Sequence, residues 1–548
     1  MICENIMFYN SLFESSLKIL PIFLFLLFVA PVIIVLSSLF YGFSENWFHL
    51  YNYVLSEYII NSILLIIGVS FFVVLIGVLS SWLVTYYNFA GKSFFEWALI
   101  LPLAVPPYIL AYTFTEIFDT YGSANILLNN IFLFEDKKVF FPNVRNIYGA
   151  IAVFSFTLYP YVYLVSRMAF INQSISIIEA GRVLGLSRVG AFFKLSIPLI
   201  RPAIFAGLAL VIMETLSDFG AVEHFAIATF TTGIFRTWFG MYDLNTAMQL
   251  ASLLLIFVTV FLVIERISRR KASFVSSNSL YKKYDIIKLR GYKNFFAMLF
   301  CFTPIFIGFI LPITELLNWT INYKLDFFNI DFLESSFNSL LLAIIAALLC
   351  TMISFLINFS TRFQGNKFLS SLSSTLMLGY AVPGLILAIG ITQLLTFLDN
   401  YIEFFKFNFI LTGSLIGLII AYIIKSYALS NSTIEASFQR VSSSLDDVSK
   451  TLNISGFKLM YKIHFPLVKT GLLTSILLVG SEVIKELPAT LILRPFNFET
   501  LAVSAYNYAS EERMYEAAAP SIAIVIIGLI PIIILSRMIK SSRPGEAL

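Results

Sequence analysis

The chain has 548 residues, a net charge of +4 and a mean hydropathy of +0.87; 59% of its residues are hydrophobic and 12% are charged. Soluble proteins carry about twice that share of charged residues, so the composition excludes a soluble globular fold and predicts an integral membrane protein. The three cysteines, Cys3, Cys301 and Cys350, are too few for a disulfide framework or a cysteine metal cluster.

Twelve apolar stretches follow one another along the chain, and each approaches the roughly 20 residues that a membrane-spanning helix needs. Helices are expected because the runs are too long and too uniformly apolar for barrel strands. The first six spans are predicted at 19–41, 59–86, 96–117, 147–168, 202–222 and 247–265. The second six are predicted at 295–317, 337–357, 370–398, 409–430, 470–490 and 517–537. The predicted fold class is therefore all-α, in two halves of six helices.

The two halves repeat each other in sequence. At a single offset of 268 residues five pairs recur, which indicates an internal duplication: Glu179 with Asp447, Pro198 with Pro466, Glu214 with Glu482, Asp218 with Glu486, and Thr232 with Thr500. Earlier in each half the offset is 277, as for Asn61 with Asn338 and Pro106 with Pro383. Pro106 and Pro383 lie within the third spans, where they are expected to kink or unwind the helix.

The lysines and arginines predict the orientation. With the N-terminus inside, 27 of the 36 fall on the inner side, eight lie in outer loops, and Lys485 lies within a span. This bias places both termini and the polar loops around 179–201 and 447–469 in the cytoplasm. A role in binding anionic lipid is an alternative explanation for the basic residues of 266–294, although ordinary positive-inside bias accounts for them.

These boundaries predict six parts. They are a first helix with its outer loop (1–56), a first domain of membrane-spanning helices (57–265), a cytoplasmic basic linker (266–294), a seventh helix with its outer loop (295–332), a second domain of membrane-spanning helices (333–537), and a cytoplasmic tail (538–548).

Candidate catalytic and nucleotide-binding motifs are weak. Ala90-Gly91-Lys92-Ser93 resembles the end of a phosphate-binding loop, but Tyr86 occupies the position where that loop needs a glycine. The histidines, His49, His224 and His464, have no metal-ligand spacing, and no Ser/His or Cys/His constellation appears. The sequence therefore predicts a chain that is not an enzyme, binds no cofactor and no nucleic acid, and leaves any ATP hydrolysis to another subunit.

Carboxylates within the fifth spans are the strongest candidates for a transport path. Glu214 and Asp218 are expected one helical turn apart on one face, and Glu482 and Glu486 repeat them. Intramembrane carboxylates normally face a bundle interior or a water path. One interpretation is a structural network in which Lys485 pairs with either glutamate; the other is a transient cation path, with Asp218 and Glu486 contacting the cargo. No stable metal site is expected.

The loops that precede the fifth spans resemble the EAA loop of bacterial ABC-importer permeases, which docks on the ATPase subunit as a cytoplasmic elbow. The first copy carries Glu179, Ala180, Gly181, Gly185 and Pro198. In the second copy, Asp447 and Asn453 replace the acid and the glycine, while Pro466 keeps its place. The resemblance implies that these residues couple the chain to an ATPase dimer.

The segments METLSDFGAVEHF at 213–225 and KELPATLILRPFNFETLAVSAY at 485–506 are similar to the ferric-iron permeases of that superfamily. The resemblance implies a fused double permease in the bacterial inner membrane that imports Fe(III) from a periplasmic binding protein docked on 223–246 and 491–516. The alternatives are a related permease for thiamine, a polyamine or an anion such as sulfate, and an ion-coupled secondary transporter, which has no need of two such elbows.

Overall fold

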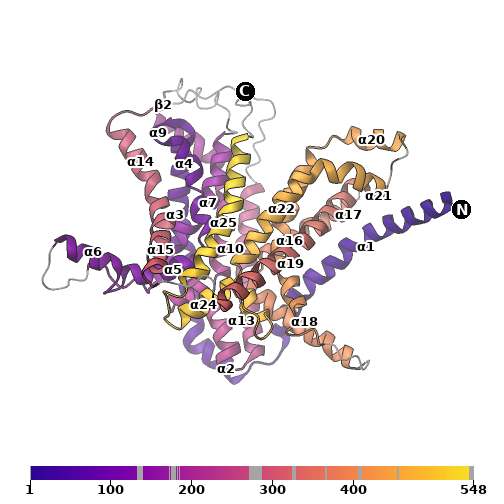
Figure 1. Ribbon diagram of the computed structural model, residues 1–548, viewed down its shortest axis with the longest axis horizontal. Coiled ribbons are helices and arrows are strands. Elements are labelled where there is room, and N and C mark those ends of the chain that lie inside the picture. The colour runs from indigo at the N-terminus through magenta and orange to yellow at the C-terminus, as the bar shows by residue number, and fades with distance from the viewer. Residues whose placement is uncertain are drawn as a thin grey trace. The chain divides into compact units, whose positions relative to one another are not determined.

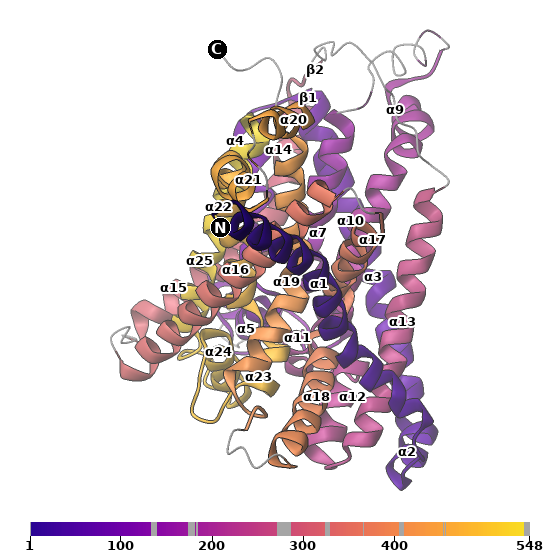
Figure 2. The ribbon, with the colours of Figure 1, turned by 90° about the vertical axis from the view of Figure 1, so that its right-hand side faces the viewer.

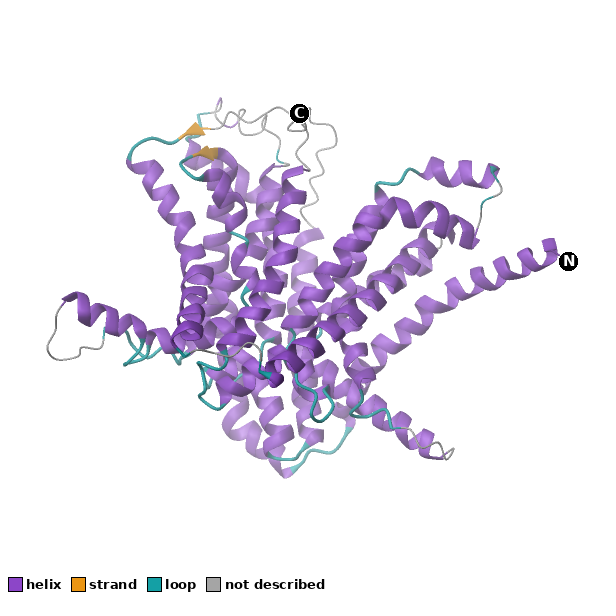
Figure 3. Ribbon diagram, in the orientation of Figure 1, coloured by secondary structure: helices purple, strands orange, loops and turns teal. Residues whose placement is uncertain are grey.

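The computed structural model describes residues 2–541 except 133–139, 172, 174–180, 182, 184, 271–286, 324–328, 365–366, 405–409, 453 and 455. Over these residues the chain is almost entirely helical, with two short strands that pair in parallel, β1 (Tyr87–Asn88) and β2 (Ile287–Lys288) (Figure 3). The prediction of an all-α membrane protein is confirmed.

Most helices of the first half are labelled in Figure 1, and Figure 2 labels α11 and α12. The described helices of this half are α1 (Ile2–Ser37), α2 (Glu45–His49), α3 (Leu55–Tyr86), α4 (Lys92–Ala98), α5 (Pro107–Phe118), α6 (Ser123–Phe132), α7 (Ile147–Ile171), α9 (Arg188–Ala191), α10 (Ile197–Ser217), α11 (Gly220–His224), α12 (Phe230–Phe235) and α13 (Leu244–Arg270).

The second half follows the same order. Its helices are α14 (Tyr292–Ile305), α15 (Leu311–Asn322), α16 (Ile330–Gln364), α17 (Lys367–Leu376), α18 (Gly384–Phe404), α19 (Leu415–Gln439), α20 (Ser443–Thr451), α21 (Gly456–Leu459), α22 (Phe465–Lys485), α23 (Pro488–Leu493), α24 (Leu501–Ser510) and α25 (Ala518–Ser541).

Within the described residues, ten helices are long and apolar enough to cross a membrane. An eleventh span is a bent pair, Lys92–Ala104 with Pro107–Phe132, and a shorter apolar helix covers Ala518–Ile534. These twelve segments follow the order of the twelve predicted spans, and each overlaps its predicted span.

The helices form two compact units. Each unit is built mainly from one half of the sequence and contains the first helix of the other half. One unit joins 1–42 to 327–504 and 533–548; within it α16, α19 and α22 pack together, and α1 lies against α16, α17 and α18 (Figure 2). The other joins 43–326 to 505–532, and in it α7 packs against α3 and α10, while α14 contacts α3 and α4. Each core therefore buries helices that are distant in sequence.

The duplication is visible in the backbone. α22 begins and ends 268 residues after α10, and the π-helical turns before them, Phe192–Ser196 and Met460–His464, keep that offset. Pro198 and Pro466 lie in the first turn of α10 and α22, where a missing N–H costs little. Each long helix therefore starts directly at the end of a widened turn.

The third spans are broken, as Pro106 and Pro383 predicted. A 3₁₀ turn (Leu101–Ala104) precedes α5, and the helices on its two sides are bent by 91°. The second half has a 3₁₀ turn at Met377–Ala381, and both turns close with the same backbone bond at offset 277: Val105 N donates to Pro102 O, and Val382 N to Gly379 O.

The predicted pairing of Thr232 with Thr500 is wrong by three residues. Thr229, not Thr232, is the N-cap of α12, and Thr500 is the residue before α24, with its hydroxyl accepting from Val503 N. An asparagine holds each loop: the Asn61 amide donates to Ala228 O and the Asn338 amide to Glu499 O. The structural equivalent of Thr500 is therefore Thr229, so the second half gains three residues in this loop.

Asp243 ties the start of α2 to the start of α13. Its carboxylate accepts from the Thr246 backbone N–H at 3.0 Å, the Ser44 hydroxyl at 2.6 Å and the Asn46 amide at 3.1 Å. Burial alone would raise the pKa of Asp243, but these hydrogen bonds outweigh it and lower the pKa to about 2.

We expect Asp243→Ala to lower the midpoint of thermal unfolding of the detergent-purified chain at pH 7, because the loss of an N-cap costs about 1 kcal/mol. The ionised carboxylate stabilises the fold fully above its ordinary pKa of 3.8, and this stabilisation is lost as the pH falls through about 2. The difference between wild type and variant should shrink over that range. A difference that grows on acidification would contradict this role.

Candidate translocation site and coupling elbows

The fifth span of the first half ends at a carboxylate. α10 stops at Ser217, and Asp218 takes an extended conformation, with φ −68° and ψ 140°. Its Oδ1 accepts the Ala221 backbone N–H at 2.8 Å, which satisfies a donor at the start of α11. The prediction of a continuous span over 202–222, with Asp218 one turn beyond Glu214 on the same helix, is wrong because the helix ends between these two carboxylates.

The second half has the same break. α22 stops at Lys485, and Glu486 is extended, with φ −71° and ψ 116°. Its Oε1 lies 3.3 Å from the Ala489 backbone N–H, which donates to it at the start of α23. The predicted span 470–490 is therefore also too long, and Asp218 and Glu486 each connect a membrane helix to a short helix.

Lys485 and Lys425, two lysines of the second half, each pair with a carboxylate. Lys485 Nζ lies 2.9 Å from Glu482 Oε2, so of the two glutamates expected for it, Lys485 pairs with Glu482. Glu486 pairs instead with Lys425, at 3.1 Å, and its side chain is only 4% exposed. Lys425 lies within α19, one of the helices long and apolar enough to cross a membrane. At offset 268 the first half has Thr157 and Ser217 in place of these lysines.

Replacing Lys425 by Met should lower the unfolding free energy by about 3 kcal/mol, because it leaves the buried Glu486 carboxylate without its cation. The double variant Lys425→Met with Glu486→Gln should recover most of this loss, since no uncompensated charge remains. Urea or thermal unfolding of the four purified proteins forms the double-mutant cycle. Additive losses would mean that the two side chains do not interact.

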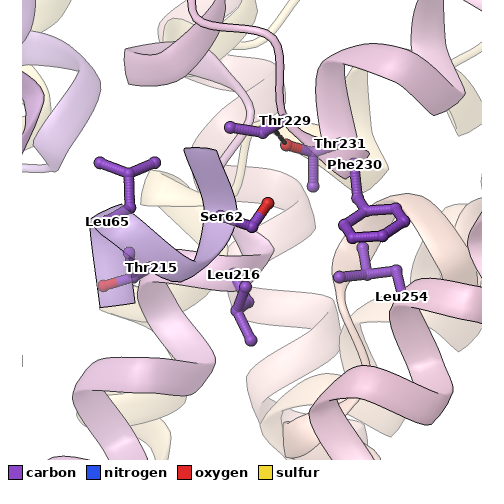
Figure 4. Close-up of a pocket in the computed structure, with 8 residues that line it drawn as sticks. All are labelled: Ser62, Leu65, Thr215, Leu216, Thr229, Phe230, Thr231 and Leu254. Carbon is purple, nitrogen blue, oxygen red and sulfur yellow. Dashed lines mark hydrogen bonds between the residues drawn. The ribbon is translucent and has the colours of Figure 1, made fainter. Parts of the chain in front are cut away.

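Threonines organise the loop that follows α11. A small cavity of about 10 Å³ is lined by Ser62, Thr215 and the hydrogen-bonded pair Thr229 and Thr231, with apolar side chains completing the lining (Figure 4). The Thr231 hydroxyl donates to Asp218 O at 2.8 Å. That volume is about the space of one water molecule, and it is lined by hydroxyls. The loop is thus fixed to the same break that Asp218 caps.

A larger polar cavity, about 200 Å³, lies beside α11 in the same unit. Titratable and hydroxyl side chains line most of it: Tyr112, Arg145, Glu223, His224, Tyr506, Ser510 and Glu512, together with Ala509. Tyr112 comes from α5, Glu223 and His224 from α11, and Tyr506 from α24. Glu223 and His224 lie in the segment 213–225 that resembles the ferric-iron permeases, but no spacing in the sequence relates them to Tyr112 and Tyr506, which come from distant segments.

His224 has a defined tautomer. Its Nε2 lies 2.9 Å from Thr115 Oγ1, and the single hydroxyl proton of Thr115 is donated to Ala111 O at 2.9 Å. We therefore assign Thr115 Oγ1 as the acceptor from His224, which puts the ring proton on Nε2 and leaves the Nδ1 lone pair available. Burial, and to a smaller extent the charge of Arg145, lowers the pKa of His224 to about 3, so the ring is neutral at physiological pH.

Two helices that contribute residues to the cavity, α11 and α24, are each followed by a residue with a strained backbone conformation. α11 closes with Ala226 at φ +55°, and α24 is followed by Glu512 at φ +60°. Both ends have the same backbone bonds, since Ile227 N donates to Val222 O and Arg513 N to Tyr508 O. This ending usually places glycine in the left-handed conformation, so a non-glycine residue there is uncommon and stores strain.

The two elbows have matching backbone geometry. Leu186 N donates to Gly181 O at 3.0 Å, and exactly 268 residues later Ile454 N donates to Ser449 O at 2.9 Å. Gly185 adopts φ +86°, and no atom lies within 4 Å of the position of an added Cβ. Its glycine is thus required by the backbone conformation, and Asn453, its counterpart, is the residue type that adopts this conformation most readily after glycine. Glu179, Ala180 and Asn453 lie outside the described residues.

The second elbow is anchored by charge. Asp446, the neighbour of Asp447, accepts from Arg362 Nε at 2.7 Å and lies 2.9 Å from His464 Nε2. Arg362 also donates to Phe438 O at the end of α19. His464 is buried beside an apolar cluster that includes Phe359. These contacts join the elbow to the ends of α16 and α19.

Gly185→Asn should retain coupling between ATPase and permease, whereas Gly185→Val should lose most of it, because a β-branched residue is strained by roughly 1–2 kcal/mol in this conformation. The measurement is the binding-protein-stimulated ATPase rate in reconstituted vesicles, with membrane insertion checked for each variant. Equal loss in both variants would mean that the glycine is needed for partner approach and not for its backbone conformation.

Comparison with known proteins assigns the chain to a family. The profile described as binding-protein-dependent transport system inner membrane component matches twice, over residues 73–272 and 351–545. The chain belongs to this family of transport permeases. These two matches cover most of both predicted domains; the boundaries of the six predicted parts stay a prediction.

Two ferric-iron permeases align over most of the chain, and a sulfate permease aligns over a smaller part. An Fe(3+)-transport system permease protein of Haemophilus influenzae is 25% identical over 88% of the chain and 90% of the relative. A ferric transport system permease protein of Actinobacillus pleuropneumoniae is 27% identical over 81% of the chain and 65% of the relative. A sulfate transport system permease protein of Salmonella typhimurium is 27% identical over 39% of the chain and 78% of the relative. The resemblance to ferric-iron permeases is confirmed.

Proposed function

We propose that this permease is the membrane subunit of an ATP-driven importer for Fe(III) in a bacterial inner membrane. The likeness to ferric permeases over most of the chain supports the cargo, and the two elbows, matched in backbone hydrogen bonding, support the coupling to ATP. A periplasmic binding protein delivers the iron to the outer loops, and a separate ATPase dimer binds the two elbows in the cytoplasm. The chain itself carries out no bond chemistry.

The long helices α10 and α22 connect the elbows to the carboxylate-capped breaks. Each has 21 residues and is about 30 Å long, close to the hydrocarbon thickness of a bilayer. One end continues from an elbow, and the other ends at Asp218 or Glu486. Movement of an elbow therefore reaches the start of α11 or α23 through a single helix, and the switch between inward- and outward-facing states is a rigid-body change of these helices.

The elbow residues act in coupling: Gly181, Gly185, Pro198 and Pro466 in shaping the turn, and Glu179, Ala180, Asp447 and Asn453 toward the ATPase. The carboxylates divide by half. Glu482 and Glu486 are neutralised by Lys485 and Lys425, which favours a structural network there. Glu214 and Asp218 occupy the matching positions of the first half, and we assign the cation path to them because carboxylates at this depth normally face a bundle interior or a water path.

The test is uptake of radiolabelled iron into vesicles that contain the permease, its ATPase and its binding protein. We expect ATP-dependent uptake of Fe(III) that unlabelled Fe(III) competes away and that sulfate, thiamine and spermidine do not. Gly185→Val, inserted to the same level, is the matched control and should abolish uptake. Competition by one of the other substrates, with no iron uptake, would overturn the proposed cargo while leaving the coupling intact.

A further inference from the structure

The polar cavity beside α11 has an unusual set of donors for a membrane permease. Two phenols, two carboxylates and one imidazole line it, from Tyr112, Tyr506, Glu223, Glu512 and His224. Phenolate and carboxylate oxygens are hard ligands, which suit a small, highly charged cation better than they suit a soft metal. Its volume, about 200 Å³, exceeds what a bare ion needs and leaves room for water or an accompanying ligand.

Tyr112 supplies an independent indication of a ligand. The side chain is 2% exposed, and its hydroxyl has no hydrogen-bond partner in the part of the chain that the structure describes. A buried hydroxyl without a partner is costly, and proteins normally satisfy it with a side chain, a water or a bound group. Tyr112 lines the cavity together with Tyr506, and it is close enough to Asp218, at the end of α10, to interact with that side chain electrostatically.

The imidazole of His224 is prepared as an electron-pair donor. Its Nε2–H is held by Thr115, which leaves Nδ1 with a free lone pair on a neutral ring. Metal-bound histidines are held in the same way, with the second nitrogen donating to an oxygen. Thr115 thus fixes the ring orientation before any cargo arrives.

The charges that line the cavity favour transient binding of a cation. Arg145 lines it with the two carboxylates, so a cation must compete with a guanidinium for them. Among the described residues no three His, Cys, Asp or Glu side chains already lie close enough to hold an ion. Glu223 also contacts Arg236 at 3.5 Å, a half-exposed pair that can be given up at little cost.

We propose that this cavity is a transit station for Fe(III), in which Tyr112, Tyr506, Glu223, Glu512 and His224 Nδ1 take the ion before it moves past Asp218 along α10. This inference rests on the proposed function. Binding through a phenolate oxygen forms an Fe–O bond and releases the phenol proton to water, with no change in oxidation state. Glu512, exposed at the mouth, is the first contact, and the buried Tyr112 is the last.

The test uses the reconstituted complex and Fe(III) supplied as its nitrilotriacetate complex. An iron–phenolate bond gives a visible charge-transfer absorption band, which should appear in wild type and weaken in both Tyr112→Phe and Tyr506→Phe. Iron uptake should fall about 10-fold or more in each, as for other metal sites that lose a supporting group. Tyr508→Phe, on the same helix as Tyr506 but outside the cavity lining, is the matched control and should retain both band and uptake.

Stability separates a ligand from a packing role. Because the Tyr112 hydroxyl has no partner, Tyr112→Phe should unfold at the same temperature as wild type or higher. If the wild type takes up iron and Tyr112→Phe keeps both the absorption band and the uptake unchanged, the proposed role of the cavity is wrong and the proposed function stands. Absence of iron uptake in wild type would overturn both.

Discussion

An uninterrupted helix that ends at a carboxylate is the constraint on which the rest of the structure depends. In a membrane every backbone N–H needs a partner inside the protein, so a helix can break only where other groups replace the lost bonds. Asp218 and Glu486 do this by accepting the N–H groups of Ala221 and Ala489. The breaks fix where α10 and α22 end, and with them the short helices that follow.

The two halves share this design but use it differently. In the second half, Lys425 and Lys485 neutralise the carboxylates, and Arg362 ties Asp446 of the elbow to the end of α19. In the first half the break leads into α11, which carries Glu223 and His224 to the polar cavity. Duplication therefore preserved the backbone around the two breaks, while the side chains beside the breaks diverged: lysines pair with Glu482 and Glu486, and α11 lines a polar cavity together with residues of 506–512.

Sequence predicted well the features that depend on local or periodic patterns. The twelve spans, the breaks at Pro106 and Pro383 and the register of Pro198 with Pro466 follow from hydropathy and proline chemistry. The ends of the fifth spans were wrong because the apolar run continues past Ser217, and only the cap by Asp218 shows that the helix has stopped. The three-residue error at Thr500 has a similar cause, since identity at a fixed offset says nothing about which threonine is the N-cap.

Tertiary features were beyond sequence reasoning. Lys425 and Glu486 are 61 residues apart, and nothing in their local sequence indicates that they pair. Tyr112 and Tyr506 reach the same cavity from segments of opposite halves, because 505–532 packs in the unit built mainly from the first half. The exchange of first helices between the units is likewise a property of packing and not of pattern.

We propose an arrangement in which both elbows face the cytoplasm and the carboxylate-capped breaks lie toward the outside. Its most direct measurement is labelling by a membrane-impermeant maleimide of Ser187→Cys and Lys458→Cys in one set, and Glu512→Cys in another, with the three native cysteines replaced by serine. In intact cells stripped of the outer membrane, we predict labelling of Glu512→Cys only, and in inside-out vesicles labelling of the two elbow positions only. Labelling of either elbow position from outside would contradict the account.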